Sequence, residues 1–290
     1  MERSKKIRII SCIAAALAVV AAVVLTIVFF PPKTVSKPDE TKLQTLAERL
    51  SGKNVSILGD SITTYEGYSD NNSYNSTLTP TLNIPYYTPS FCSLSGVNNT
   101  WWMRAVNDLN LNLLVNNSCG GLRAYCPDGP DGVERADNLH CDTGSLSGTV
   151  PDIVFVYLGT NDVFVKNDVG NFGDIEWSDL IAEDGGTYAK PSNVVEAYAI
   201  ILHKIKTLYD NPDVFCLNVL QNNSGSVTKI NGEIAKVAEH FGASLVDISN
   251  ESGIIQKTLS KFTLDTIHPN ETGMKLISYT LEHAMIAKYL

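Results

Sequence analysis

Residues 54–63 read Asn-Val-Ser-Ile-Leu-Gly-Asp-Ser-Ile-Thr, a short apolar run that leads directly into glycine, aspartate and serine. The part from Asn54 to Leu58 has the length and the composition of a buried strand. A serine just past the end of such a strand can present its hydroxyl above the sheet. An ordinary turn rich in small polar residues is the plainer interpretation, and this stretch alone does not separate the two.

Further strand-like runs follow, and helical patterns separate them. The expected strands are Asn54–Leu58, Leu111–Asn116, Ile153–Leu158, Val214–Leu220 and Ser244–Ile248. Apolar residues recur at helical spacing within residues 43–50, 194–208, 230–241 and 271–289, with Asn193 and Glu196 placed for an N-cap interaction. This alternation predicts an α/β fold of three layers, α/β/α, with a five-stranded parallel sheet of flavodoxin-like type. Its ligands should bind beyond the carboxyl ends of the strands.

Two long polar segments, residues 65–100 and 164–191, follow the first and third expected strands. Loops of this length inside a compact domain usually serve a site, as lids or as substrate walls. Because both segments begin at carboxyl ends of strands, we expect them to surround the ligand site.

The N-terminal segment is expected to lie outside this fold. Four basic residues precede the uncharged run Ile9–Phe30, whose 22 residues are enough to cross the roughly 30 Å hydrocarbon core of a bilayer as a helix. We therefore predict a cytoplasmic basic tail over 1–8, a transmembrane anchor over 9–30, a Pro-rich linker over 31–42 and the main domain over 43–290, outside the cell membrane. The alternative is a signal peptide that is cleaved from a secreted protein.

Charge argues against nucleic acid as a partner. Without residues 1–30 the chain has 18 basic and 30 acidic residues, a formal net charge of −12. Such a surface does not attract nucleic acid or anionic lipid headgroups.

The cysteines outside the apolar run are odd in number, which argues against a complete disulfide framework. Cys126 and Cys141 could pair in an oxidising compartment, as could Cys92 and Cys119. Cys216 falls in an expected strand and should be a buried thiol. No cysteine or histidine spacing suggests a structural zinc site.

Three more polar motifs accompany Gly59-Asp60-Ser61. The second expected strand ends in Asn116-Asn117-Ser118-Cys119-Gly120-Gly121, the third is followed by Gly159-Thr160-Asn161-Asp162, and Asp265-Thr266-Ile267-His268-Pro269 precedes the last helix. Glycine N–H groups and asparagine amides can donate to an oxyanion, and a histidine held by a carboxylate can act as a base for serine. Each motif alone has a plainer interpretation, as a turn or as a helix cap beside a surface histidine.

Together the four motifs resemble the SGNH/GDSL hydrolase family, and the resemblance covers nearly all of residues 50–290. It implies Ser61 as the nucleophile, His268 as the general base and Asp265 as the acid that orients the base. The implied chemistry is two-step acyl transfer to water, which requires neither a metal nor an organic cofactor.

The same resemblance implies an oxyanion hole. Its donors would be the backbone N–H groups of Ser61 and Gly121 and the side-chain amide of Asn161, with Gly120 as the alternative to Gly121. Asp60 and Asp162 are expected to brace turns.

Aromatic residues gather after the expected nucleophile and suggest the substrate. They are Tyr65, Tyr68, Tyr74, Tyr86, Tyr87, Phe91, Trp101 and Trp102. With the asparagines among them, such rings suit sugar stacking, so Tyr65 and Trp101 are candidate substrate contacts. The alternative is that Trp101 and Trp102 begin a helix and pack on the core. The other histidines (His140, His203, His240 and His283) are expected to be surface or packing residues.

The aromatic-rich segment after Ser61 lacks a long aliphatic run that would line a slot for a fatty-acyl chain. We therefore predict a serine esterase that removes a short acyl group, acetyl, from a carbohydrate outside the membrane. The alternatives are a lysophospholipase or general short-chain esterase, an O-acyltransferase to a glycan, and a non-catalytic glycan-binding relative.

Overall fold

The structure, a computed structural model, describes residues 33–69, 85–89, 94–127, 131–141, 146–220 and 226–290. The chain divides into two units, Met1–Thr34 and Val35–Leu290, and only residues 33–34 of the first are described. The strands of the second unit are β1 (Asn54–Gly59), β2 (Asn112–Asn116), β3 (Ile153–Tyr157), β4 (Asp213–Leu217) and β5 (Ser244–Val246). Its longer helices are α2 (Glu40–Leu50), α3 (Trp101–Asp108), α7 (Val194–Leu208), α8 (Ser226–His240) and α11 (Glu271–Tyr289). Its short helical turns are η1 (Ser61–Thr63), η2 (Val97–Asn99), α4 (Gly132–Arg135), α5 (Thr160–Phe164), η4 (Phe172–Asp174), α6 (Trp177–Leu180), α9 (Ile248–Glu251) and α10 (Leu259–Phe262).

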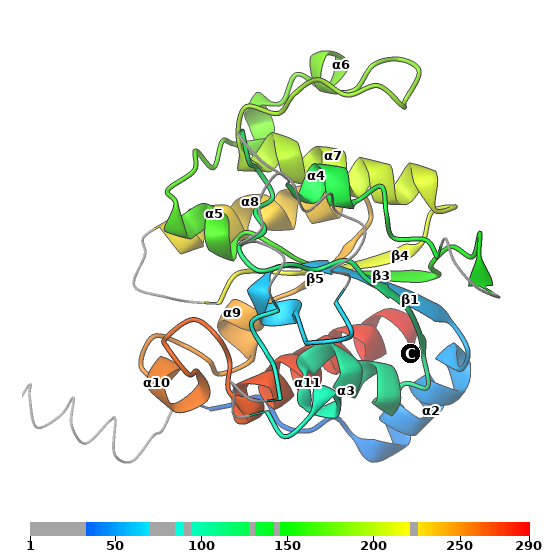
Figure 1. The fold of residues 1–290 in the computed structure, drawn as a ribbon, viewed down its shortest axis with the longest axis vertical. Helices are drawn as coiled ribbons and strands as arrows, with labels where there is room; N and C mark the ends of the chain where they lie inside the picture. The colour runs from blue at the N-terminus through cyan, green and yellow to red at the C-terminus, as the bar shows by residue number, and fades with distance from the viewer. Residues whose placement is uncertain (1–32, 70–84, 90–93, 128–130, 142–145, 221–225) are drawn as a thin grey trace, which may run out of the picture. The chain divides into compact units, whose positions relative to one another are not determined.

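The sheet has five strands in the order β2-β1-β3-β4-β5, and every neighbouring pair is parallel. The predicted five-stranded parallel sheet is therefore confirmed. In Figure 1 the sheet lies between two groups of helices, with α4, α5, α7 and α8 on one face and α2, α3, α9 and α11 on the other. Because all strands are parallel, their carboxyl ends meet at one edge, which positions the site.

Strand residues alternate between the two hydrophobic cores. In β3, Phe155 and Tyr157 belong to the core shared with α3 and α11, whereas Val154 and Val156 belong to the core shared with α7 and α8. Successive side chains of a strand point to opposite faces, so a sheet covered on both sides needs an uninterrupted apolar run. The sequence Ile-Val-Phe-Val-Tyr of β3, which is buried throughout, meets that need.

Side-chain caps begin the helices that flank the site. Asn193 accepts a hydrogen bond from the N–H of Glu196 at 3.0 Å, which confirms the expected N-cap of α7. Asn270 accepts from the N–H of Gly273 at 3.0 Å and so begins α11 directly after the motif with Asp265 and His268.

The transmembrane helix predicted as part of the fold class is not supported. Residues 1–32, with the predicted tail and the predicted anchor over 9–30, lie outside the described residues. Within the described part of the chain, no helix has both the length and the apolar character needed to cross a membrane. The fold class is therefore corrected to the five-stranded parallel α/β sheet without that helix.

Part of the segment predicted as a linker packs against the rest of the second unit. The N–H of Val35 donates to the carbonyl oxygen of Ser252, and Nε2 of His283 lies 3.0 Å from the carbonyl oxygen of Ser36. Helix α2 begins at Glu40, where the Asp39 side chain accepts from the N–H of Lys42. These contacts attach residues 35–42 to the fold.

The suggested disulfides are not formed by the described cysteines. Cys119 and Cys126 are buried free thiols, so neither joins its suggested partner, and Cys92 lies outside the described residues. Cys216 is fully buried in β4, as expected, and burial raises the pKa of its thiol to about 12.

Candidate functional site

Ser61 stands at the carboxyl end of β1, at the start of the short turn η1. Asp60 caps this turn, because its Oδ1 accepts the N–H of Ile62 at 2.9 Å. A Cβ at Gly59 would overlap the side chain of Thr63, so only glycine lets the turn fold back this tightly. The local sequence thus lifts the Ser61 hydroxyl above the sheet.

Asp60 itself is fully buried. Burial raises the pKa of its carboxyl to about 7, although the N–H of Ile62 and the hydroxyl of Thr160 favour the charged form. Asp162 accepts backbone N–H groups of Ala124 and Tyr125 at 2.9 and 3.0 Å. Both aspartates brace turns, as predicted.

Asp265 and His268 share a short loop between α10 and α11. The N–H of Leu264 donates to the carbonyl oxygen of His268 at 2.7 Å, and an isolated bridge joins Thr263 to Pro269, so backbone contacts close the loop. Asp265 Oδ1 accepts the N–H of His268 at 2.8 Å, and its Oδ2 lies 2.7 Å from His268 Nδ1. The carboxylate therefore holds the imidazole through both its backbone and its ring.

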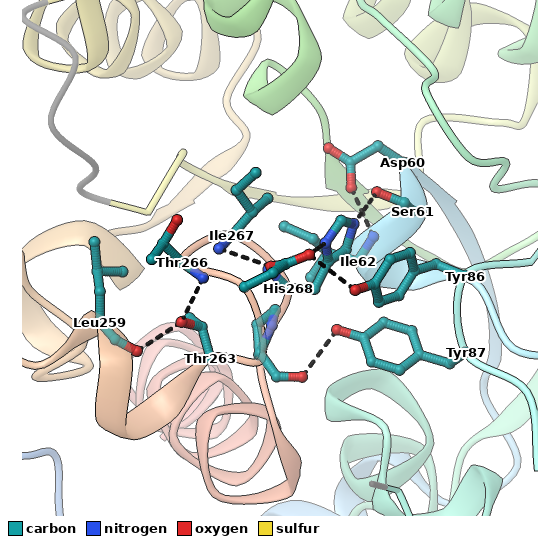
Figure 2. Close-up of polar contacts among 12 residues, drawn as sticks. Asp60, Ser61, Ile62, Tyr86, Tyr87, Leu259, Thr263, Thr266, Ile267 and His268 are labelled. Carbon is teal, nitrogen blue, oxygen red and sulfur yellow. Dashed lines mark hydrogen bonds and ion pairs between the residues drawn. The ribbon is translucent and has the colours of Figure 1, made fainter. Parts of the chain in front are cut away.

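The other ring nitrogen of His268 faces the serine. Nε2 lies 2.8 Å from Ser61 Oγ, a contact between residues 207 positions apart (Figure 2). The structure thus brings Ser61, His268 and Asp265 into one hydrogen-bonded chain, Oγ to Nε2 and Nδ1 to carboxylate. This is the geometry in which an imidazole can take a proton from a serine hydroxyl.

The electrostatics of the pair suit a neutral base beside a charged carboxylate. Burial lowers the pKa of His268, and Asp265 offsets only part of that effect. Burial would raise the pKa of Asp265, but hydrogen bonds from the backbone and imidazole of His268 and from the Tyr86 hydroxyl outweigh it and lower the pKa to about 2. At neutral pH the histidine therefore keeps an unprotonated nitrogen toward Ser61.

The expected oxyanion donors lie at the neighbouring strand ends. Among the described residues, no acceptor pairs with the backbone N–H of Ser61, Gly120 or Gly121. Gly121 has a φ of +75°, the left-handed conformation that favours glycine. Asn161 stands in the first turn of α5, and its Nδ2 donates to the carbonyl oxygen of Leu122 at 2.9 Å. That bond uses one of the two amide hydrogens and orients the other.

A small apolar pocket adjoins the serine. Its described lining residues are Ile62, Thr160, Val219, Leu220, Leu259, Thr266 and Ile267. Three of these are chain neighbours of Ser61, Asn161 and His268. The enclosed space is about 10 Å³, close to what one water molecule needs, so the pocket suits a small group.

The two residues expected to contact substrate do not line this pocket. Trp101 is fully buried, and its ring packs on Phe155 and Tyr157 in the core, which leaves it no accessible face. Tyr65 is 5% exposed and packs edge-on to Tyr68. Trp102 is also fully buried in α3, so the alternative interpretation of the tryptophans describes the structure. Tyr74 and Phe91 lie outside the described residues.

The remaining histidines make other contacts. His203 bonds the hydroxyl of Tyr188 at 3.0 Å, His240 stacks on Trp177, His283 bonds the carbonyl of Ser36, and His140 lies beside the ring of Tyr209. In the described ranges, no group of three or more His, Cys, Asp or Glu side chains is placed to hold a metal ion.

Tyr86 and Tyr87 are the site residues whose role sequence reasoning missed. Tyr86 stacks on His268 and donates to Asp265, and Tyr87 donates to the carbonyl oxygen of Pro269 at 2.9 Å (Figure 2). The sequence marks them only as members of an aromatic-rich segment. No spacing rule relates them to a loop about 180 positions further along.

Comparison with known proteins gives a family and structures with a similar fold. A family model described as GDSL-like Lipase/Acylhydrolase matches residues 53–285. A crystal structure described as a GDSL-like lipase from Bacteroides ovatus has 23% identity and a TM-score of 0.58, with 80% of this chain and 97% of that chain covered. A second, from Bacteroides uniformis, has 22% identity and a TM-score of 0.54, with 79% and 93% covered. The search of curated proteins finds no match.

Proposed function

Because the chain belongs to the GDSL-like lipase/acylhydrolase family, we propose that it hydrolyses carboxylic esters with Ser61, His268 and Asp265. One observation carries the proposal: Ser61 Oγ lies 2.8 Å from His268 Nε2 while Asp265 Oδ2 lies 2.7 Å from Nδ1. A serine hydroxyl needs such a base to become a nucleophile at neutral pH.

The reaction would proceed in two acyl-transfer steps. Ser61 Oγ attacks the ester carbonyl while its proton passes to His268 Nε2, and Asp265 stabilises the imidazolium that forms. The negative oxygen of the tetrahedral intermediate accepts hydrogen bonds from the N–H groups of Ser61 and Gly121 and from the Asn161 amide. As the intermediate collapses, the imidazolium protonates the leaving alcohol. Water then attacks the acyl-serine by the same route and restores the enzyme.

The proposed acyl group is short, with acetyl as the first candidate. The pocket beside Ser61 supports this choice, because its small volume and apolar lining suit a methyl group better than a fatty-acyl chain. The proposal that the ester belongs to a carbohydrate rests on the asparagines of residues 65–102 and on the exposed ring of Tyr68, since Tyr65, Trp101 and Trp102 are buried in the core. The location outside the cytoplasm stays a prediction from residues 1–30.

Hydrolysis of p-nitrophenyl acetate tests the reaction. We expect Ser61→Ala and His268→Ala each to abolish turnover, because the first removes the nucleophilic oxygen and the second removes the nitrogen that accepts its proton. Ser178→Ala on α6 and His283→Ala on α11 are matched controls, since their side chains lie in other parts of the fold. Full turnover in either site variant contradicts the assignment.

A substrate panel tests the acyl group and the alcohol. The value of kcat/KM should fall steadily from p-nitrophenyl acetate to the octanoate, and acetate should be released from acetylated glycans in preference to acyl chains from lysophospholipids. A preference for the octanoate or for lysophospholipids contradicts the proposed substrate and leaves the Ser61 reaction intact.

A further inference from the structure

Tyr86 contacts both members of the candidate acid–base pair. Its ring lies parallel to the imidazole of His268, with centroids 3.4 Å apart and an interplanar angle of 7°. Its hydroxyl donates to Asp265 Oδ2 at 2.8 Å, the same oxygen that accepts from His268 Nδ1. In Figure 2 the side chains of Tyr86 and Tyr87 both extend toward the loop that carries His268.

The backbone of Tyr86 is attached to the serine turn. Its N–H donates to Thr64 Oγ1 at 2.8 Å, and the Thr64 hydroxyl donates to the carbonyl oxygen of Ser61 at 2.9 Å. One residue therefore connects the turn that carries the nucleophile with the loop that carries the base. Tyr87 supports this connection, because its ring packs edge-on to Tyr86 at 5.1 Å and its hydroxyl holds Pro269.

The imidazole has few polar neighbours among the described residues. Asp265 faces it from its own loop and Ser61 from the β1–η1 turn. Tyr86 and Tyr87 face it from residues 85–89. Asp265 is the charged group among these neighbours, and its Oδ2 serves two donors. A phenol that shares the carboxylate weakens its attraction for the imidazolium proton.

We propose that Tyr86 is a positioning residue for the base: its ring fixes the plane of the His268 imidazole, and its hydroxyl fixes the Asp265 carboxylate, so that Nε2 stays aimed at Ser61 Oγ. The kinetic consequence rests on the proposed esterase function. The placement of the imidazole does not depend on it.

Tyr86→Phe keeps the stacked ring and removes only the hydroxyl. Because the carboxylate that orients the imidazole then loses one of its donors, we expect kcat for p-nitrophenyl acetate to fall about 10-fold or more, with KM within about twofold. The carboxylate that loses a donor attracts the imidazolium proton more strongly, so the pKa of His268 rises. The acid limb of the pH–rate profile should move to higher pH by the same amount.

Tyr289→Phe is the matched control. Its hydroxyl also donates to an aspartate, Asp213 Oδ2, at 2.7 Å, but at the amino end of β4, the opposite edge of the sheet from Ser61. We expect this variant to leave kcat and the pH profile unchanged. If Tyr86→Phe and Tyr289→Phe have the same kcat and the same pH profile, the proposal is overturned. It is also overturned if Tyr86→Phe changes KM alone, because Tyr86 would then be a substrate contact.

An NMR titration of His268 separates this inference from the proposed function. In the Ser61→Ala protein, which needs no turnover, adding Tyr86→Phe should raise the pKa of His268, whereas adding Tyr289→Phe should not. An unchanged pKa overturns the role of Tyr86 whether or not the protein is an esterase. Failure of every ester to react overturns the proposed function alone.

Discussion

The side-chain amide of Asn161, the proposed oxyanion donor, is held in place by a hydrogen bond within the protein. Its Nδ2 donates to the carbonyl oxygen of Leu122, and this bond fixes the plane of the amide while the second hydrogen points elsewhere. The residue stands in the first turn of α5, whose N-cap, Gly159, has a φ of +114°. A donor held in this way needs little reorganisation when negative charge develops on a substrate oxygen.

Replacing Asn161 by alanine should therefore reduce catalysis far more than stability. We expect kcat for p-nitrophenyl acetate to fall by about 10²–10³, the range for loss of one oxyanion donor, with KM little changed. Asn171→Ala, which removes an exposed amide bonded to Asp174, is the control. Wild-type kcat in Asn161→Ala, with the protein folded by circular dichroism, would exclude Asn161 from the oxyanion hole.

Individual residues differ in how far the sequence predicts their place. The Asp265–His268 contact spans three positions, and Ser61 lies two residues past the end of β1. Each motif alone has a plainer interpretation, and only the four motifs together predict that these residues form one site. The tryptophans were a different case. An aromatic ring can stack on a sugar or fill a core, and only packing against Phe155 and Tyr157 decides that Trp101 fills the core.

At the scale of elements, the start of α11 is held tightly against the loop that carries the base. A Cβ at Gly273 would overlap the carbonyl oxygen of Phe262, which accepts the N–H of Asn270. The helix can approach this backbone only with a glycine at that position. The approach determines where the loop from Thr263 to Pro269 lies, and with it His268.

We therefore expect Gly273→Ala to lower both the melting temperature and kcat, because the helix must move away from Phe262 and carry the loop with it. Gly232→Ala in the middle of α8 is the control, since a Cβ there meets no other atom. That change should raise stability by about 0.5–1 kcal/mol and leave kcat alone. Thermal unfolding and steady-state kinetics measure both effects. If Gly273→Ala and Gly232→Ala both raised the melting temperature, the close contact between Gly273 and Phe262 would not be what positions the loop.

Elements were predicted more reliably than their ends. The fourth strand was expected over Val214–Leu220 and ends instead at Leu217. Beyond it the backbone bonds to side chains: Asn231 of α8 accepts the N–H of Val219 at 2.8 Å and donates to its carbonyl oxygen at 2.8 Å. An apolar run predicts burial but not which partner satisfies the backbone, so the boundary was wrong by three residues.

Across the whole molecule, buried carboxyl groups make stability depend on pH. Burial raises the pKa of Asp60 and of Glu282 to about 7 and that of Asp131 to about 6. In the unfolded chain these groups release their protons near pH 4, so between about pH 4 and 7 the folded state holds more protons. Folding stability contributed by these groups therefore falls as pH rises through that window.

Burial lowers the pKa of His203 and His268, which gives a contribution of the opposite sign. We expect the three carboxyl groups to outweigh these two histidines, so the melting temperature should be higher at pH 5 than at pH 8. Glu282→Gln removes one of these titrations, because Glu282 is fully buried and its carboxylate accepts from the Ser278 hydroxyl at 2.7 Å. We expect the difference between the melting temperatures at pH 5 and pH 8 to shrink by several degrees in this variant. Glu239→Gln, an exposed change on α8, should keep the wild-type difference. An equal difference in all three proteins would show that Glu282 titrates normally.

The distances along the chain between the site residues also bear on how activity appears during refolding. Asp265 and His268 are three positions apart in a loop that closes on itself, whereas Ser61 and His268 are 207 positions apart. Closing the longer span costs more chain entropy and needs the sheet from β1 onward to be in place. The loop that carries Asp265 and His268 can therefore form before Ser61 reaches it. Recovery of activity would then mark one of the last steps of folding.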